Sequence, residues 1–191
     1  MKKNNRKNYN PALEFNNLDS STELHFQYYL DELKSLGFIK EYFIEPETLL
    51  LNNEVILAYN KIIELKTKTK VVEAETLLIP EHSYKYDFKI IWDDKILTHK
   101  LQRYFFIDSF LTSRIEVKPD IDFNNMTRLF SLRTQPMIFD KYQLYIQLIK
   151  VPTIFKLTFT PDRYLLTDVK KTLRSIRYKP IINFSQFELL K

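Results

Sequence analysis

The sequence predicts an α/β domain in which helices flank a mixed β-sheet. Apolar residues recur with helical spacing after residue 20 and again after residue 134, and strand-like apolar runs lie between these two segments. The chain has 191 residues, of which 45% are apolar and 15% aromatic, so it can bury a sizeable core. No linker or internal repeat divides it, and we expect a single domain over residues 20–191.

The N-terminal region is expected to form a polar, basic arm followed by a helix. The arm covers residues 1–19, and the helix extends from Ser20, a favoured N-cap residue, to about Leu36. Gly37, the only glycine of the chain, ends this helix. Its apolar stripe consists of Phe26, Leu30 and Leu33.

Strand-like segments fill the region up to residue 118. They cover residues 39–51, 71–79, 84–92 and 111–118. Pro46 interrupts the first of these segments, and Pro119 ends the last. Residues 52–70 are ambiguous: residues 55–65 fit a helix or a strand, and residues 66–70 fit a polar turn or an exposed edge. Residues 95–110 are expected to form an insertion with a short helix.

Two helices and one strand are expected near the C-terminus. A helix over residues 134–149 begins with Thr134 as its N-cap. A strand over residues 153–159 and a basic helix over residues 167–177 follow, and residues 181–190 are expected to be extended. The order of helix, strands, helix, strand and helix is typical of an α/β domain with a mixed sheet.

The composition excludes several kinds of site. The chain has no cysteine, which excludes disulfides, thiol nucleophiles and cysteine-type zinc sites, and its single glycine excludes glycine-rich phosphate loops. The net charge of +5 is concentrated in the opening arm and in residues 170–179, which leaves an acidic centre. Basic ends around an acidic centre suit a nuclease, although basic tails that only aid solubility give the same pattern.

No secretory or membrane segment is expected. The first residues carry cations but no apolar run, so they do not read as a secretory signal. No later apolar run is long enough to span a bilayer. We therefore expect a soluble, cytoplasmic protein with no membrane partner.

The strand segment Ile-Glu-Val-Lys over residues 115–118 carries the strongest chemical signal. Glu116 and Lys118 lie two residues apart and therefore on the same face of a strand. Burying both charges costs several kcal/mol unless they pair or hold a metal. Asp87 lies between aromatic residues at the start of a neighbouring strand, so two carboxylates can converge and hold Mg²⁺ against a phosphodiester.

Each of these residues is assigned a role in this hypothesis. Asp87 and Glu116 would be the main metal ligands, with the Val117 carbonyl as a neutral third ligand. Lys118 would position or deprotonate the attacking water, and Glu23 would hold a second metal ion or a water next to the first. Two simpler interpretations remain open: a solvated strand face for Glu116 and Lys118, and a capping box in which Glu23 closes the helix start.

These residues resemble a known family. The helix Glu23, the run His-Ser-Tyr-Lys-Tyr-Asp-Phe over residues 82–88, and Glu-Val-Lys over residues 116–118 are similar to the PD-(D/E)XK nuclease superfamily. The local similarity is closest to the phage-type endonuclease I Holliday-junction resolvases and covers residues 20–149. The resemblance implies a restriction-endonuclease-like core, dependence on Mg²⁺ or Mn²⁺, cleavage of DNA and a possible homodimer.

The sequence departs from the family pattern in two places. Tyr86 stands where the family usually has a proline before its first acid. The gap between Asp87 and Glu116 is 29 residues, which is longer than the short hairpin typical of the family. Asp108, eight residues before Glu116, is therefore an alternative metal ligand, although the strand pattern after residue 87 favours Asp87.

Several polar residues after the Glu-Val-Lys segment are candidate DNA contacts. They would position the phosphate backbone without reading the base sequence. These candidates are Arg128, Arg133, Gln135, Lys141, Lys170, Lys171 and Arg174. For Lys141, an ordinary solvated cation is an equally good interpretation.

The leading hypothesis is a Mg²⁺-dependent DNA endonuclease, encoded by a phage, that acts in the host cytoplasm on branched duplex DNA. One alternative is a non-catalytic nucleic-acid-binding or phage assembly protein that retains the fold. Another alternative is a restriction-type endonuclease with sequence specificity.

Overall fold

A four-stranded mixed sheet forms the centre of the molecule. The computed structural model describes residues 20–118, 125–166 and 181–190, and the strand order in this sheet is β1-β6-β7-β8. β1 pairs antiparallel with β6, β6 pairs antiparallel with β7, and β7 pairs parallel with β8. The four strands are β1 (Ile39–Ile44), β6 (Phe88–Trp92), β7 (Thr112–Lys118) and β8 (Gln147–Lys150). The predicted α/β class with a mixed sheet is therefore confirmed.

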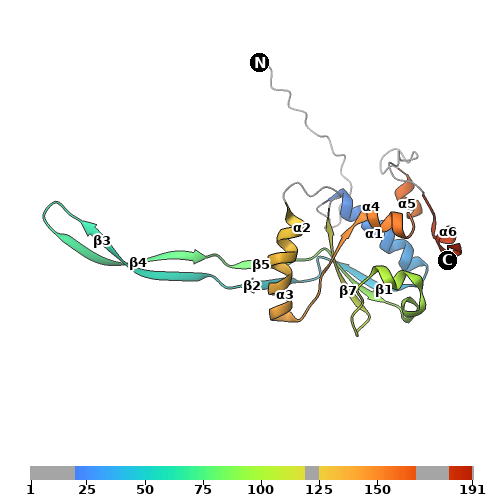
Figure 1. Cartoon of the computed structure of the whole chain (residues 1–191), viewed down its shortest axis with the longest axis horizontal. Helices are drawn as coiled ribbons and strands as arrows, with labels where there is room; N and C mark the ends of the chain where they lie inside the picture. The colour runs from blue at the N-terminus through green and yellow to red at the C-terminus, as the bar shows by residue number, and fades with distance from the viewer. Residues whose placement is uncertain (1–19, 119–124, 167–180, 191) are drawn as a thin grey trace, which may run out of the picture.

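Helix α1 (Ser21–Ser35) covers one face of this sheet and forms the main core with it (Figure 1). Phe26, Leu30 and Leu33, the predicted apolar stripe, are all fully buried. The short helix α4 (Val151–Leu157) contributes to the same core. The sheet side chains in this core include Phe88, Ile90, Trp92, Ile115 and Val117.

A second, smaller core covers the opposite face of β7. It contains buried apolar side chains from the β2–β5 ribbon, from the segment that follows β5, and from the helical stretch after residue 125. The elements of this layer are β2 (Thr48–Asn52), β5 (His82–Lys85), α2 (Met126–Leu129), the π-helical turn η3 (Phe130–Thr134) and α3 (Gln135–Tyr142). Because Ile115 and Val117 face the main core, Glu116 and Lys118 face this second layer.

A long two-stranded arm leaves the body next to α2 and α3 (Figure 1). It consists of β3 (Val55–Glu64) and β4 (Thr69–Ile79), which pair only with each other. Large apolar side chains on it are exposed, including Ile62 at 65% and Val71 at 60%. The ambiguous segment over residues 52–70 is therefore mainly strand.

The segment over residues 95–110 belongs to the body. It contains two 3-10 turns, η1 (Asp94–Thr98) and η2 (Lys100–Tyr104). Ile96 and Leu101 are fully buried in the main core. The predicted short helix is thus present as two turns, which pack against the sheet because of their apolar side chains.

Three C-terminal predictions were wrong. The segment over residues 153–159, predicted as a strand, lies mostly in α4, since Pro152 suits a first helical turn and the adjacent Ile154 and Phe155 are both buried. The helix predicted over residues 134–149 ends at Tyr142, where Gln143 adopts a left-handed conformation, and Thr134 makes no capping hydrogen bond. The end predicted as extended contains α6 (Phe184–Leu189), capped by Asn183.

The remaining regions complete the description. A short helix, α5 (Asp162–Leu165), follows α4. The predicted basic arm over residues 1–19 and most of the predicted basic helix over residues 167–177 lie outside the described residues. Among the described helices, none has the length and apolar character needed to cross a membrane.

Gly37 ends α1 in the way the sequence predicts. Its φ angle is +78°, and its N–H donates to the Lys34 carbonyl while the Phe38 N–H donates to the Leu33 carbonyl. These two hydrogen bonds around a residue in the left-handed conformation close the last turn of the helix. A Cβ at Gly37 would lie 3.1 Å from the Lys95 Nζ, which belongs to a flexible side chain and can move.

We expect Gly37→Ala to lower the free energy of unfolding by about 1 kcal/mol, because an alanine in the left-handed region is strained. Gly37→Asn should cost less, since asparagine tolerates this conformation. Urea unfolding of the two variants and the parent measures the difference. Equal losses in both variants would contradict a conformational cause.

Candidate active site

Asp87 lies in the short break between β5 and β6, beside the second half of β7. Phe88 pairs with Ile115 in the ladder, which places Asp87 next to the following residues of β7. The Val117 N–H donates to Asp87 Oδ2 at 2.6 Å. This hydrogen bond holds the carboxylate of Asp87 at the Glu116–Val117 peptide.

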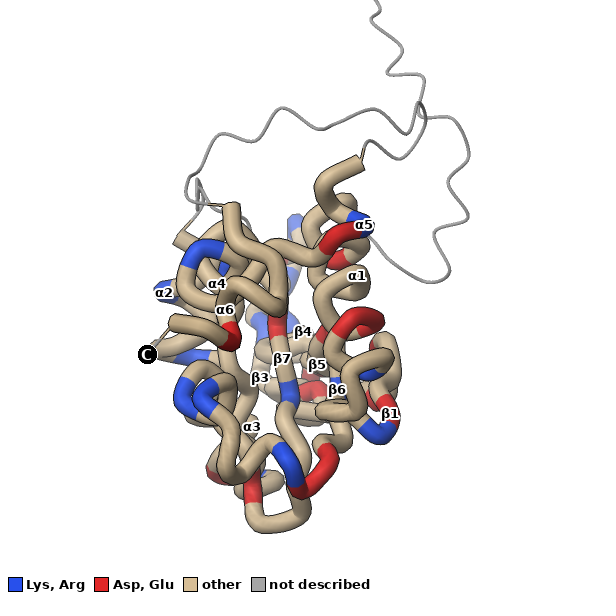
Figure 2. Tube along the Cα trace, turned by 90° about the vertical axis from the view of Figure 1, so that its right-hand side faces the viewer, with Lys and Arg blue, Asp and Glu red and all other residues tan. Residues whose placement is uncertain are grey.

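Glu116 and Lys118 form a buried ion pair on one face of β7. The distance between Lys118 Nζ and Glu116 Oε1 is 2.5 Å, and the side chains are only 15% and 10% exposed. Acidic and basic residues follow one another along β7 in the middle of the molecule (Figure 2). The interpretation of Glu116 and Lys118 as a solvated strand face is therefore wrong.

The second oxygen of Glu116 is buried without a hydrogen-bond donor. Glu116 Oε2 has no partner among the described residues, and neither has the buried hydroxyl of Tyr84. Burial is the largest cause that raises the pKa of Tyr84 far above its usual range; the nearby Glu116 carboxylate, as a charge and as an acceptor, comes next, and the charge of Asp87 last. The Tyr84 hydroxyl therefore lies within the electrostatic reach of both carboxylates.

Tyr84 is a site residue to which the sequence analysis gave no role. It lies in β5, where its ring packs against Phe130 at a centroid distance of 5.5 Å. Its place three residues before Asp87 was part of the recognised run over residues 82–88. The short spacing between Tyr84 and Asp87 could have indicated that Tyr84 lies near the site, because only the break between β5 and β6 separates the two residues.

The electrostatics of Asp87 connect all four candidate catalytic residues. Burial is the largest cause that raises the pKa of Asp87 to about 7, and the charge of Glu116 comes next. The Val117 N–H and the Lys118 charge lower it, whereas Glu23 raises it. Glu23, Glu116 and Lys118 therefore each lie within electrostatic reach of Asp87.

Glu23 also takes part in the N-terminal cap of α1. Its N–H donates to Ser20 Oγ at 3.2 Å, and Ser20 Oγ donates to Glu23 Oε1 at 2.6 Å. The expected side-chain cap by Ser20 is thus present, and Glu23 returns a bond to the Ser20 hydroxyl. Because Glu23 also raises the pKa of Asp87, capping and proximity to the site occur together.

The residues of this site fit a Mg²⁺ or Mn²⁺ ion bound by few protein ligands. Among the described residues, no three histidine or acidic side chains form a ready-made metal cage. Mg²⁺ does not need one, since it commonly binds one or two carboxylates and keeps several waters. A cation near Asp87 and Glu116 would give Glu116 Oε2 a partner and relieve the repulsion that raises the pKa of Asp87.

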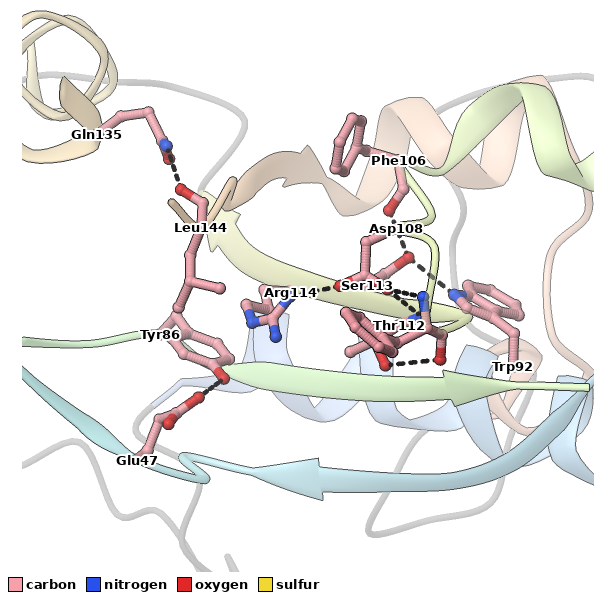
Figure 3. A network of polar contacts seen from close by, with 11 residues as sticks. Glu47, Tyr86, Trp92, Phe106, Asp108, Thr112, Ser113, Arg114, Gln135 and Leu144 are labelled. Carbon is pink, nitrogen blue, oxygen red and sulfur yellow. Dashed lines mark hydrogen bonds and ion pairs between the residues drawn. The ribbon is translucent and has the colours of Figure 1, made fainter. Parts of the chain in front are cut away.

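Asp108, the alternative ligand, has a different set of contacts. Its Oδ1 accepts hydrogen bonds from the N–H groups of Phe110 and Thr112, and its Oδ2 pairs with Arg114 Nη1 at 2.9 Å (Figure 3). Asp108 therefore stabilises the turn that leads into β7. Of the two aspartates, Asp87 is the one that contacts the Glu116–Val117 segment.

Two of the predicted DNA contacts are engaged inside the protein. Gln135 donates to the Leu144 carbonyl and accepts from the Ile146 N–H, both at 3.0 Å, so it ties α3 to the segment that enters β8 (Figure 3). Lys141 Nζ donates to the Leu50 carbonyl at 2.6 Å. These contacts make Gln135 and Lys141 poorer candidates for phosphate binding than the sequence indicated.

The other predicted contacts divide into two groups. Arg128 and Arg133 are exposed on α2 and η3, so they are accessible to a ligand. Lys170, Lys171 and Arg174 lie outside the described residues.

A groove opens beside Lys118. It has a volume of about 320 Å³ and lies between β8, α2 and α4. Lys118, Thr127 and Lys150 contribute polar groups to its lining. The lysine that pairs with Glu116 therefore lies between the carboxylates and a surface depression.

Comparisons with known proteins give no match for this chain. No protein-family model, curated protein or solved structure matches it.

The raised pKa of Asp87 predicts a pH-dependent stability of the metal-free protein. Between the unfolded value of 3.8 and the folded value of about 7, the folded state binds more protons, so stability is lost as pH rises through this range. The parent should therefore lose on the order of 2–4 kcal/mol of its free energy of unfolding as pH rises, at 1.36 kcal/mol per pKa unit. We expect Asp87→Asn to remove this pH-dependent loss.

Urea unfolding in a metal chelator at about pH 5 and about pH 8.5 measures this effect, because these pH values lie on either side of the folded pKa of about 7. The exposed Glu41→Gln on β1 is the matched control and should follow the parent. An Asp87→Asn variant with the parent's pH dependence would show that Asp87 is not the titrating group.

Proposed function

We propose that this chain is a Mg²⁺-dependent DNA endonuclease that hydrolyses phosphodiester bonds in branched duplex DNA. The observation that carries the proposal is the contact of Asp87, just before β6, with the Glu116–Val117 peptide of β7, where Lys118 contacts Glu116. Few structural needs explain a half-buried aspartate next to a buried glutamate, since like charges repel in a medium of low dielectric.

Each residue has a distinct task in this proposal. Asp87, Glu116 and the Val117 carbonyl would hold the ion, which neutralises phosphoryl oxygens and stabilises the leaving alkoxide when bound. Lys118, the cation of the pair with Glu116, would orient the attacking water and offset negative charge on the phosphate. Tyr84 would border the site beside Glu116.

The chain order of the site supports the resemblance to the PD-(D/E)XK nucleases. A helix with a glutamate, an aspartate at a strand start, a Glu-x-Lys strand and a further helical region follow one another as α1, β6, β7 and α2–α3. The long gap between Asp87 and Glu116 is compatible with this order. Its two 3-10 turns pack on the body, and β6 and β7 still pair directly.

The surroundings of the site are compatible with a DNA substrate. Arg128 and Arg133 are exposed on the layer that faces Glu116 and Lys118, and they would bind phosphates without reading sequence. A branched substrate and a homodimer remain part of the proposal through the resemblance to junction resolvases.

One observation favours the non-catalytic alternative. The 2.5 Å contact between Lys118 and Glu116 partly satisfies both charges without a metal ion. A nucleic-acid-binding protein with the same fold could retain such a pair for structural reasons. Metal binding and cleavage therefore have to be measured separately.

We expect Glu116→Ala and Lys118→Ala each to lower Mg²⁺-dependent cleavage of a four-way DNA junction by about 100-fold or more, because each removes a group that acts on the reacting atoms. Binding of the junction should persist. Cleavage assays with junction and linear duplex measure the effect and distinguish a structure-selective enzyme from a restriction-type one. Glu41→Gln is the control, and variants that cut as well as the parent would overturn the proposal.

Metal binding predicts a stability effect that does not depend on activity. Mg²⁺ at about 100 times its dissociation constant should stabilise the parent by about 2.7 kcal/mol. Glu116→Gln and Asp87→Asn should lose most of this gain, whereas Glu41→Gln should keep it. Thermal unfolding with Mg²⁺ or a chelator measures the shift, and equal shifts in all four proteins would place the ion elsewhere.

A further inference from the structure

The charges of the β3–β4 arm are separated onto two faces. Residues directly opposite in an antiparallel ladder share a face, and successive residues alternate. Lys61 pairs with Val72 and Lys70 pairs with Ile63, which places both lysines on one face. The acids of the paired strands lie on the other face, where the pairs are Glu64 with Thr69, Glu73 with Asn60 and Glu75 with Ala58.

The tip of the arm adds two further cations. Lys66 and Lys68 lie in the turn between the strands, where the Leu65 N–H donates to the Lys68 carbonyl at 2.9 Å. The lysine face is defined here as Tyr59, Lys61, Ile63, Lys70 and Val72, together with Lys66 and Lys68 of the turn. All four lysines are exposed, and none is among the ion pairs of the described residues.

The lysines on the paired strands are also close to one another. Lys61 and Lys70 occupy diagonal positions of the ladder, which are roughly 7–8 Å apart in antiparallel sheets. Like charges at this spacing repel one another. An anion bound over the lysine face would offset the repulsion between the lysines, and the backbone of a nucleic acid supplies a row of phosphate anions.

The arm and the candidate active site are parts of one ribbon. β4 leads through Pro80 and Glu81 into β5, which carries Tyr84 beside Glu116 (Figure 1). From Tyr84 to Lys70 the nearly continuous strand spans roughly 45 Å at about 3.3 Å per residue. This length corresponds to roughly 13 base pairs of a duplex with a rise of about 3.4 Å per base pair.

We propose that the lysine face of the arm binds the phosphate backbone of duplex DNA about one helical turn away from the scissile bond. The inference rests on the proposed nuclease function and adds a second DNA-binding site to it. Tyr59 and Leu65, exposed at 45% and 50%, would lie against sugars and bases beside the lysines. A second copy of the chain is the less favoured occupant, because two lysine faces repel each other.

The test measures binding without cleavage. In a Glu116→Gln background, Lys66→Gln/Lys68→Gln is compared with Lys40→Gln/Lys156→Gln, which removes the same charge from exposed positions of the body. Fluorescence anisotropy is recorded with four-way junctions whose arms are about 24 or about 8 base pairs long, since only the longer arms reach the tip at about 3.4 Å per base pair.

We expect the arm variant to bind the long-armed junction about 10-fold more weakly at about 0.1 M salt. The slope of log affinity against log salt should fall by roughly 1–2, since each lost phosphate contact removes about 0.9. Binding of the short-armed junction should be unchanged. Glu73→Gln/Glu75→Gln on the opposite face should stay within about threefold of the background protein.

Three outcomes would overturn the inference. Equal affinities and salt slopes for the arm variant and its body control would show that the tip does not touch DNA, while cleavage by the parent would leave the nuclease proposal intact. If the background protein sediments as a dimer and the arm variant as a monomer, with DNA affinity unchanged, the arm serves self-association. Absence of DNA binding by the parent would overturn both proposals.

Discussion

The site depends on one constraint, which is that strand β7 lies between two cores. Ile115 and Val117 are buried against α1, so alternation forces Glu116 and Lys118 into the second layer. Their charges cannot reach bulk water freely at 10% and 15% side-chain exposure. Asp87 is held at the same place by the Val117 N–H. The backbone therefore holds these charged side chains close together, although the repulsion between the two carboxylates opposes this.

This arrangement leaves the electrostatics incompletely balanced. Lys118 satisfies one oxygen of Glu116, whereas the other oxygen and the Tyr84 hydroxyl have no hydrogen-bond partner among the described residues. The charges of Glu23 and Glu116 also raise the pKa of Asp87, and the charge of Lys118 lowers it. Buried negative charge destabilises a protein that lacks a counter-ion. In the proposed nuclease, a divalent cation would supply that counter-ion.

Local patterns in the sequence predicted the parts of the fold that depend on local physics. Helix α1 with its end at Gly37, strand β7, and the shared face of Glu116 and Lys118 follow from spacing alone. The single strand predicted over residues 84–92 is instead divided into β5 and β6, which belong to different sheets. The pairing of distant segments did not follow from spacing. The register between β6 and β7 places Asp87 against the Glu116–Val117 peptide. Tyr84 reaches the site from β5, which belongs to the second layer. Helix α4 buries two successive apolar residues, Ile154 and Phe155, which a half-buried strand would not do.

The arm shows why exposure and function have to be considered together. A two-stranded ribbon is at best marginally stable in water, and this one exposes apolar side chains along its length. Its residues add little to either core, so stability of the body does not explain it. The separation of Lys61 and Lys70 from Glu73 and Glu75 is likewise unnecessary for pairing, since charges of opposite sign placed across the ladder would stabilise it. The lysine face has no acidic residue, although lysine–glutamate pairs across the ladder would stabilise the ribbon. This charge pattern is typical of a surface that binds a polyanion.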